Sequence, residues 1–487
     1  MTQEHLLNLI WFRSDLRVYD NPALSAAMSS GPSIAVYVIS EETWDAHNES
    51  PAKRSLILRQ LEILSGALSE LNVPFYVLTA ESMQKLESSI SEFASQLKVS
   101  HLFYNEDYGL NERRLAKSVS ENLRNHGIIS QSFHDQCIVS PGTLRNQKGS
   151  YYHVFSAFKR AFLKQSKTLS RHLVNKPSPQ PPLTVKAPNL NVATFQVDSR
   201  WDHHWPAGED HAHELLNNFM EERAASYHKA RDIPSLDATS SLSPYLATGI
   251  VSTSQCLRSA LSYNQGEFEG RNEGVNTWIN ELLWREFYRH LLYAYPRLSM
   301  HKPFKKETDQ LPWRKDHRLF EQWKAGKTGY PIVDAAMRQL KEKAWMHNRL
   351  RMITAMFLTK HLLIDWRLGE AYFMEMLVDG DLASNNGGWQ WSASTGVDAV
   401  PYFRIFNPTR QSERFDPQGQ FIRRYVPELQ TLDSKSIHQP TKEQRAACAY
   451  PAEIVEHALA TSQTKAAFKS LHKQADTEQL PLLDYYS

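Results

Sequence analysis

Cysteine is scarce in this sequence of 487 residues, and targeting and membrane signals are absent. The three cysteines, Cys137, Cys256 and Cys448, lie far apart and lack the short spacings of metal ligands. We therefore expect neither a disulfide framework nor a metal site, and a reducing cytoplasm fits this cysteine usage. No run approaches the roughly 20 apolar residues that a membrane helix needs. The N-terminus also lacks a basic segment followed by a long apolar run, so no secretory signal is evident.

The dinucleotide-binding fingerprint is also absent, although the first third of the chain alternates between strand-like and helix-like segments. Short runs rich in β-branched and aromatic residues predict strands at 6–12, 33–40, 73–79, 101–105 and 129–135. Amphipathic stretches such as 52–71 and 82–97 separate these runs. Strands spaced by helices favour a doubly wound parallel sheet, so we predict a Rossmann-like α/β domain over residues 1–135. Because no G-x-G-x-x-G follows a strand, this domain is not a typical NAD-binding module.

Strand signals nearly vanish in the rest of the chain. The proline-rich stretch KPSPQPPLTVKAPNLN belongs to a predicted inter-domain linker over residues 136–210. Helical periodicity then appears at 276–293, 333–344, 348–363 and 369–377, and we predict long loops at 294–312 and 378–410. We therefore predict an all-α domain over residues 211–487.

Positive charge is concentrated in one segment, although the whole chain has a formal net charge of only +2. Residues 271–355 contain 17 Lys+Arg and 9 Asp+Glu, a net charge of +8. A solvated helical surface and a polyanion-binding face both fit this pattern. Eight of the 12 tryptophans fall between Trp278 and Trp391, and interleaved aromatic and cationic residues favour stacking on bases or on a planar cofactor.

Two helical segments carry candidate ligand-binding side chains. In NELLWREFYRHL (280–291), three- and four-residue spacings place one set on the same side of a helix: Glu281, Trp284, Arg285 and Tyr288. This segment is either a core helix with a buried tryptophan or an aromatic platform beside an acid. The segment WMHNRLRM (345–352) clusters Asn348, Arg349, Arg351 and Met352 near a helix start. Plain surface exposure explains this cluster, and so does an anionic partner, since arginine is not favoured at that end of a helix.

Two further segments have unusual compositions. DGDLASNNGGWQWSAS (379–394) is a poor helix and a poor strand, so we predict a structured loop or helix cap that allows close approach of a ligand. A purely structural role for Trp389 and Trp391 stays open. TSSLSPYLATG (239–249) offers four hydroxyls before a proline-started helix, which suits a phosphate cradle, although capping accounts for one or two of them.

Together these segments resemble the DNA photolyase/cryptochrome family, specifically bacterial class I cyclobutane pyrimidine dimer photolyases. The strings ELLWREFYRHL, GKTGYPIVDAAMRQL, WMHNRLRM and NNGGWQW carry the resemblance, which extends from residues 11–24 to 421–429. It implies an α/β antenna domain joined by a long linker to a helical FAD domain. The implied activity is light-driven transfer of an electron from reduced FAD to a pyrimidine dimer flipped out of DNA.

The resemblance implies a role for particular residues of the helical domain. It assigns FAD binding to Tyr227, Thr239, Ser240, Ser241, Leu242, Ser243, Glu281, Asn348, Arg351, Asp379, Gly380, Asp381 and Asn385. Ser241 stands where some relatives carry arginine, which puts one phosphate contact in doubt. Asn385 is assigned to the side of the flavin N5 atom, where an amide can donate or accept. Trp389, Trp366 and Trp313 match the family's electron-transfer chain, which reduces oxidised flavin.

The same resemblance implies a lesion pocket and DNA contacts. These residues are Arg231, Glu281, Trp284, Tyr288, Asn348, Arg349, Met352 and Trp391. The two tryptophans would form the aromatic walls, Glu281 a polar contact to the dimer, and Arg231 a contact to the DNA backbone. We expect no membrane partner and a monomer.

The antenna chromophore implied by folate-using relatives is 5,10-methenyltetrahydrofolate, near His47, Asn111 and Glu112. Asn111 and Glu112 also suit the start of an ordinary helix, where a cap is followed by an acid. Met300 stands where a close relative carries a lysine that would face the folate tail, and losing that cation should weaken folate binding.

Three other functions compete with dimer repair. A (6-4) photoproduct photolyase carries a histidine pair where this chain has Asn348 and Met352. Cryptochromes, which are blue-light photoreceptors, commonly replace the residue at Asn385 by Asp or Cys. A non-catalytic nucleic-acid-binding module leaves the hydroxyl cradle unexplained.

Overall fold

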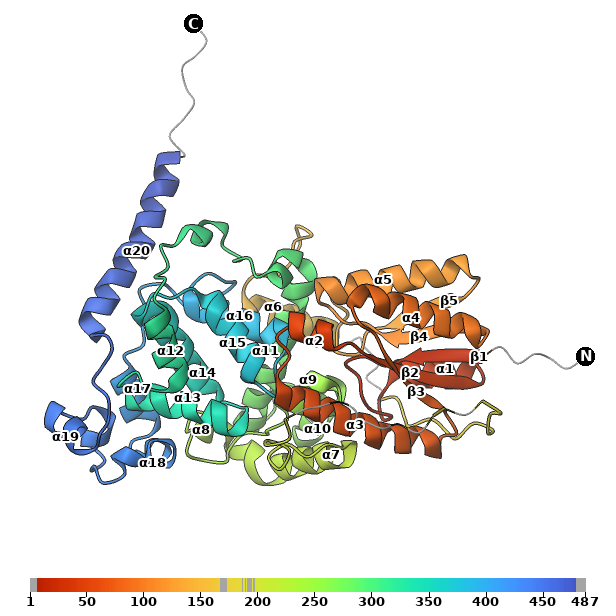
Figure 1. Ribbon diagram of the computed structural model, residues 1–487, viewed down its shortest axis with the longest axis horizontal. Coiled ribbons are helices and arrows are strands. Elements are labelled where there is room, and N and C mark those ends of the chain that lie inside the picture. The colour runs from red at the N-terminus through yellow and green to blue at the C-terminus, as the bar shows by residue number, and fades with distance from the viewer. Residues whose placement is uncertain are drawn as a thin grey trace, which may run out of the picture. The chain divides into compact units, whose positions relative to one another are not determined.

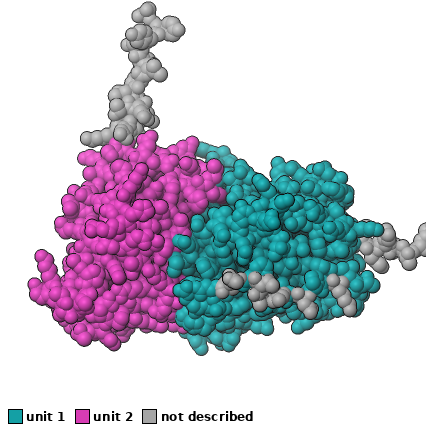
Figure 2. Space-filling view, in the orientation of Figure 1, with its two compact units in different colours: residues 1–229, 238–296, 374–383 teal, residues 230–237, 297–373, 384–487 magenta. Residues whose placement is uncertain are grey.

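The computed structural model describes residues 7–166 and 198–478, together with 173–185, 187, 188, 190 and 195. Two compact units divide the chain, as coloured in Figure 2. Unit 1 comprises residues 1–229, 238–296 and 374–383, and unit 2 comprises residues 230–237, 297–373 and 384–487. Within the described ranges, no helix is both long and apolar enough to cross a membrane.

A five-stranded parallel sheet forms the N-terminal part of unit 1 (Figure 1). Its strands are β1 (Leu7–Trp11), β2 (Ser33–Ile39), β3 (Phe75–Thr79), β4 (Val99–Asn105) and β5 (Ile129–Phe133). The order β3-β2-β1-β4-β5 places the first strand in the middle, and Ile10 lies opposite both Ala35 and Phe103. All five strands were predicted from the sequence, and the predicted doubly wound α/β architecture is confirmed.

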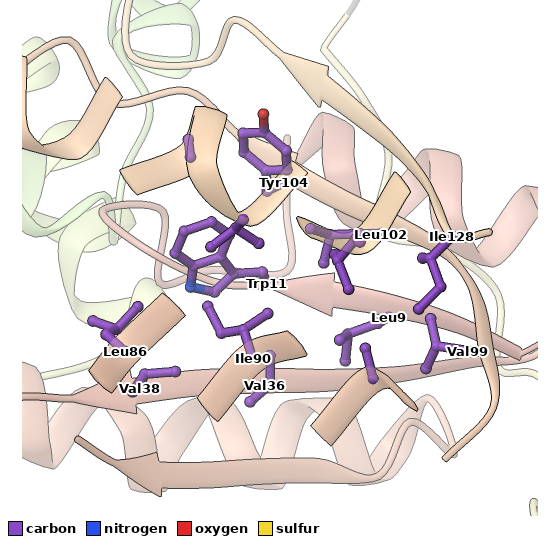
Figure 3. Close-up of a cluster of buried hydrophobic side chains, with 14 of the residues drawn as sticks. Leu9, Trp11, Val36, Val38, Leu86, Ile90, Val99, Leu102, Tyr104 and Ile128 are labelled. Atoms are coloured by element: carbon purple, nitrogen blue, oxygen red, sulfur yellow. The ribbon is translucent and has the colours of Figure 1, made fainter. Parts of the chain in front are cut away.

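Helices cover both faces of this sheet. On one face, side chains such as Trp11 and Val36 pack with Leu86, Ile90 and Val119 of α4 (Met83–Gln96) and α5 (Leu110–Asn125), as Figure 3 shows in part. Alternate strand residues face the other side, where α1 (Pro22–Ser30) and α3 (Pro51–Glu70) contact the sheet. Because both faces are covered, every residue of β2 is buried, which explains why it reads as a continuous apolar run.

The remainder of the chain contains no further strand among its described residues. The other elements of unit 1 are α2 (Glu41–Ala46), α6 (Phe155–Ser166), α7 (Glu209–Asn218), η2 (Phe219–Arg223), η3 (Ala224–Ser226), α8 (Tyr227–Ala230), α9 (Ser243–Thr248), α10 (Thr253–Tyr263) and α11 (Glu273–Ala294). The last residue of α8 belongs to unit 2. α6 lies inside the segment predicted to link the domains, and the predicted domain boundaries stay a prediction.

All regular secondary structure in the described part of unit 2 is helical. Its elements are η4 (Pro296–Met300), η5 (Lys306–Gln310), α12 (His317–Ala325), α13 (Pro331–Lys343), α14 (Asn348–Met356), η6 (Phe357–His361), α15 (Trp366–Met376), α16 (Leu382–Ala393), α17 (Pro408–Phe415), α18 (Gln420–Tyr425), η7 (Pro427–Leu429), η8 (Ser436–His438), α19 (Lys442–Ala447) and α20 (His457–Glu478). A few terminal residues of η4, α15 and α16 belong to unit 1. The predicted all-helical C-terminal architecture is confirmed.

The predicted loop at 378–410 is wrong for residues 382–393, which form α16. Gly387 and Gly388 make this sequence a poor helix former in isolation. Packing within unit 2 outweighs that preference, because Trp389 is only 2% exposed and lies edge-on to Phe373 at 4.9 Å between ring centroids. The predicted loop at 294–312 likewise contains two short 3-10 turns, η4 and η5.

Candidate functional site

The predicted cofactor residues fall in both units. In unit 1 the segment 239–243 carries four half-buried hydroxyls around Leu242, which is 1% exposed. Ser241 has a φ of 54°, in the left-handed region that few non-glycine residues adopt. The carbonyl of Thr239 accepts a hydrogen bond from Arg223 Nη1 at 3.4 Å. These contacts hold a short hydroxyl-rich segment in a defined conformation.

Helix α11 carries the predicted Glu281, Trp284 and Tyr288, all half-buried. The Trp284 ring stacks on Phe155 of α6, with centroids 3.7 Å apart and an interplanar angle of 7°. The Trp284 and Tyr288 rings also lie close together, with their centroids 5.8 Å apart. One face of the predicted lesion wall is therefore already covered. The sequence did not predict a role for Phe155, because this residue lies in the predicted linker, more than 100 residues from its partner Trp284.

The segment 379–381 of unit 1 is anchored from several sides. Lys53 Nζ donates to the Gly380 carbonyl at 2.7 Å, and Asp381 Oδ2 lies 3.4 Å from Arg289 Nη2. Asp381 Oδ1 also accepts from the backbone N–H of Ala383, at the start of α16. The predicted helix-cap role of this segment is thus present, and Asp379 is 8% exposed.

Two arginines of α11, the half-buried Arg285 and the buried Arg289, lie near this segment. Burial, together with the neighbouring Arg289, lowers the pKa of Arg285 to about 10. The Arg285 guanidinium donates to the carbonyls of Gln136 and Leu246 and to Thr253 Oγ1, at 2.7–3.1 Å. This arginine, predicted only as part of a helix face, holds together backbone segments of unit 1.

In unit 2 the predicted rim residues gather around an acid that sequence reasoning missed. Arg349 Nη2 lies 2.8 Å from Asp232 Oδ1, and Arg231 Nε lies 3.9 Å from the same oxygen. Arg349 also lies over the Phe415 ring at 4.5 Å and near the Met352 sulfur at 3.9 Å. Asp232 therefore partly neutralises both predicted DNA-binding arginines.

The start of α14 is well defined. His347 caps the helix by accepting the backbone N–H of Arg349, and burial lowers the pKa of His347 to about 4. Arg351 Nε donates to the Met346 carbonyl at 2.8 Å, whereas Asn348 is exposed. The cluster predicted at 345–352 thus has a rigid N-terminal turn with one exposed amide.

The amide nitrogen of Asn385 donates to the Glu370 carbonyl at 2.9 Å. Trp389 and Trp391, two residues apart on α16, differ in exposure: Trp389 is buried and Trp391 is half-buried. Trp366 is 1% exposed. Trp313 is half-buried and packs against Leu311, Phe468 and Leu471. The predicted electron-transfer tryptophans therefore include two buried rings and one ring with access to solvent.

The excess positive charge of 271–355 lies wholly in its unit 2 part. Residues 297–355 contain 14 Lys+Arg and 6 Asp+Glu, a net charge of +8, whereas residues 271–296 contain three of each. A basic surface would therefore come from unit 2.

A cavity of about 180 Å³ lies at the carboxyl ends of the strands in unit 1. Trp11, Arg13, Tyr37, His47 and Glu112 are among its lining residues. From β1 the chain continues to β2 and β3 on one side of the sheet, whereas β4 and β5 lie on the other side of β1. The strand order therefore reverses between β1 and β4, and open α/β sheets bind ligands at the carboxyl ends of the strands next to such a point.

The three predicted antenna residues lie together at this edge of the sheet. His47 Nδ1 is 3.6 Å from Glu112 Oε1, and His47 Nε2 is 3.4 Å from Asn111 Nδ2. Glu112 lies in the first turn of α5, as expected for an ordinary helix start.

One buried cluster of unit 1 has metal-ligand chemistry: Cys137, Glu286 and His290, with ligand atoms within 4.8 Å of one another. Both carboxylate oxygens of Glu286 accept backbone N–H groups, from Ile138 and Val139. His290 Nε2 lies 2.9 Å from the Val139 carbonyl, and burial raises the pKa of the Cys137 thiol. These contacts fit a clamp that holds residues 137–139 on α11.

Known proteins are similar to this chain along most of its length. Residues 278–470 match the family model described as the FAD binding domain of DNA photolyase, and residues 8–182 match the model described as DNA photolyase. The deoxyribodipyrimidine photo-lyase of Vibrio cholerae is 45% identical, with 93% of this chain and 97% of that protein covered. The deoxyribodipyrimidine photo-lyase of Escherichia coli is 44% identical, with 96% of this chain and 99% of that protein covered.

Solved structures are similar as well. A bacterial class III photolyase from Agrobacterium tumefaciens has a TM-score of 0.83 and 32% identity, covering 97% of this chain and 99% of its own. A cryptochrome from Synechocystis has a TM-score of 0.84 and 28% identity, covering 96% of this chain and 100% of its own.

Proposed function

Since this chain belongs to the DNA photolyase family and is a deoxyribodipyrimidine photo-lyase that repairs DNA with light, we propose that its substrate is the cyclobutane pyrimidine dimer. When bound, light-excited reduced FAD supplies the electron that splits the dimer and takes it back afterwards. The residues of the chain bind and orient the cofactor and the lesion rather than act as acid or base. The observation that carries this proposal is the identity of 44–45% to two such enzymes over nearly the full length.

The side-chain chemistry of the predicted cofactor residues fits FAD. The hydroxyls of 239–243 can donate to phosphate oxygens, and the carboxylates of Asp379 and Asp381 can accept from ribose hydroxyls or amino groups. The Asn385 nitrogen is engaged with Glu370, which leaves the amide oxygen for a flavin atom. Tyr227, Glu281, Asn348 and Arg351 complete the proposed set.

The lesion would be bound by stacking and by charge. Trp284 and Trp391 offer half-buried rings, and base–aromatic stacking is worth roughly 1–3 kcal/mol per base. Arg231 and Arg349 would contact phosphates, which makes binding independent of sequence and sensitive to salt. Glu281, Tyr288, Asn348 and Met352 would border the dimer.

Trp389, Trp366 and Trp313 would carry electrons inward to reduce oxidised flavin. The greater exposure of Trp313 than of Trp366 and Trp389 supports its place at the outer end, because that member must meet a reductant in solution.

The antenna would be 5,10-methenyltetrahydrofolate near His47, Asn111 and Glu112. The Glu112 carboxylate can accept from the amino edge of a pterin, and the Asn111 amide adds a donor. The proximity of the three side chains supports this assignment. We also propose that the enzyme acts as a monomer.

The test is repair of an oligonucleotide that contains one cyclobutane dimer, under blue light and in the dark. A matched oligonucleotide with a (6-4) photoproduct serves as the control. We expect dimer reversal in light only and no repair of the control. Repair of the (6-4) lesion, or none of the dimer by the FAD-loaded protein, would refute the proposed substrate.

A further inference from the structure

A directed chain of hydrogen bonds in unit 2 fixes the amides next to Asn385. The backbone N–H of Phe304 donates to Gln390 Oε1 at 2.8 Å, and Gln390 Nε2 donates to Asn386 Oδ1 at 2.8 Å. Asn386 Nδ2 then donates to Glu370 Oε1, also at 2.8 Å. Because a backbone N–H can only donate, the chain has one possible direction and ends on the carboxylate of Glu370.

Glu370 is almost completely buried, at 1% exposure, and its second oxygen faces a histidine. His301 Nδ1 lies 2.8 Å from Glu370 Oε2. A buried carboxyl group needs polar partners, and Asn386 and His301 supply them. The His301 side chain is 53% exposed, so this pair connects a buried acid to solvent.

The backbone of Glu370 controls Asn385 directly. The Glu370 carbonyl oxygen accepts from the Asn385 amide at 2.9 Å. A carbonyl oxygen carries no hydrogen, so the amide nitrogen must face it and Asn385 Oδ1 must face away. One residue of α15 therefore holds two consecutive amides of α16, one through its side chain and one through its backbone.

We propose that Glu370 and His301 form a positioning pair that keeps the Asn385 amide nitrogen on α15 and its oxygen available to the flavin. The inference rests on the proposed function, in which Asn385 lies on the N5 side of FAD. Reduced flavin carries a hydrogen on N5, which the amide oxygen can accept, whereas oxidised N5 is itself an acceptor and would face another acceptor. The pair therefore favours the reduced cofactor that repair requires.

This bias depends on pH. The hydrogen bond to Glu370 raises the pKa of His301 above its ordinary 6.5, although partial burial and, to a smaller extent, Arg367 oppose the shift. Arg367 Nε donates to the His301 carbonyl, and its guanidinium pairs with Asp309 and Asp365. The imidazolium is present below the raised pKa and is lost as pH rises through it, so the preference for reduced flavin should weaken above pH 6.5.

The experiment compares FAD-loaded wild type with Glu370→Gln and His301→Ala. The control is Glu428→Gln, which removes a half-buried carboxylate from the Arg338 ion pair of unit 2 without touching α15 or α16. The readouts are the flavin midpoint potential and the rate at which reduced flavin is oxidised by air in the dark, from pH 5.5 to 9. In both test variants we expect a lower midpoint potential and about fivefold faster oxidation, because the loss of one hydrogen bond changes a rate by about that factor. We expect no change in the control.

His301→Lys is the rescue variant, because it keeps a cation and a donor but does not titrate in this range. It should restore the potential that wild type has at low pH and remove the part of the pH dependence that His301 contributes, leaving only the slope that proton uptake by the flavin gives every variant. Potentials of His301→Ala equal to those of wild type at every pH would overturn the proposal, and so would a lysine variant that behaves like alanine. Because His301 is half exposed, its variants decide the question even if Glu370→Gln does not fold.

The two proposals fail differently. A wild-type protein that binds no FAD, or that repairs no dimer when loaded, refutes the proposed function. A wild type that repairs dimers while its variants keep the wild-type potential refutes only the positioning pair.

Discussion

Asp232 should restrain DNA binding, because it neutralises part of the charge that Arg231 and Arg349 would offer to phosphates. Its Oδ1 lies 2.8 Å from Arg349 and 3.9 Å from Arg231, so the three side chains carry a net charge of +1. Replacing Asp232 by Asn keeps the size of the side chain and raises that charge to +2. At about 4 Å in water one such interaction is worth roughly 1 kcal/mol, or about fivefold in affinity.

The assay is fluorescence anisotropy with a labelled duplex, damaged or undamaged, between 50 and 200 mM salt. We expect Asp232→Asn to bind both duplexes up to about fivefold more tightly at low salt. The plot of log affinity against log salt should steepen by up to roughly 0.9. Arg349→Ala should weaken binding to both duplexes and flatten that plot. If Asp232→Asn binds more weakly than wild type, the acid positions Arg349 instead of masking it, and the reasoning is wrong.

The remaining predictions concern electron flow, acid stability and the antenna. Trp313→Phe should block photoreduction of oxidised flavin by external reductants but leave repair intact once FAD is chemically reduced; loss of repair in the pre-reduced variant would refute a role limited to reactivation. Burial lowers the pKa of His347 to about 4 and that of His361 to about 3, so the unfolded state binds protons more readily below pH 6.5. The unfolding free energy should therefore fall as pH drops from 6.5 to 5, by roughly 2 kcal/mol for each histidine. Urea denaturation at the two pH values measures this change, and equal unfolding free energies would contradict the prediction. Added folate should give the purified protein a near-ultraviolet band and energy transfer to flavin, and Glu112→Ala should bind folate more weakly; equal affinity would exclude Glu112 from the site.

The elements of the α/β domain could be predicted because each strand is a short apolar run between amphipathic helices. α16 could not, since Gly387 and Gly388 argue against a helix and only its packing in unit 2 stabilises one. Helix propensity describes the preference of the isolated chain, whereas Trp389 stabilises α16 by packing against residues that are distant in sequence.

The candidate site shows the same limit. Its aromatic and hydroxyl residues are visible in dense, unusual strings such as NNGGWQW. Phe155 and Glu370 stand in unremarkable surroundings, and they act on predicted residues that are 129 and 15 positions away. Asp232 follows the predicted Arg231 directly, but its shorter contact is with Arg349, 117 positions away. No local pattern reports such distant partners, so the predicted set contained side chains that would touch ligands but not those that hold them.

The stacking of Phe155 on Trp284 bears on how quickly a lesion can be accepted. A ring that is already held in one rotamer loses little conformational freedom when a base docks on it, whereas ordering a free side chain costs about 0.5–1.5 kcal/mol. The wall is thus set before the dimer arrives, and the search along undamaged DNA needs no rearrangement of this ring at each trial. Replacing Phe155 by Ala would leave every predicted contact residue in place and yet turn a fixed template into one that has to be ordered anew at each encounter.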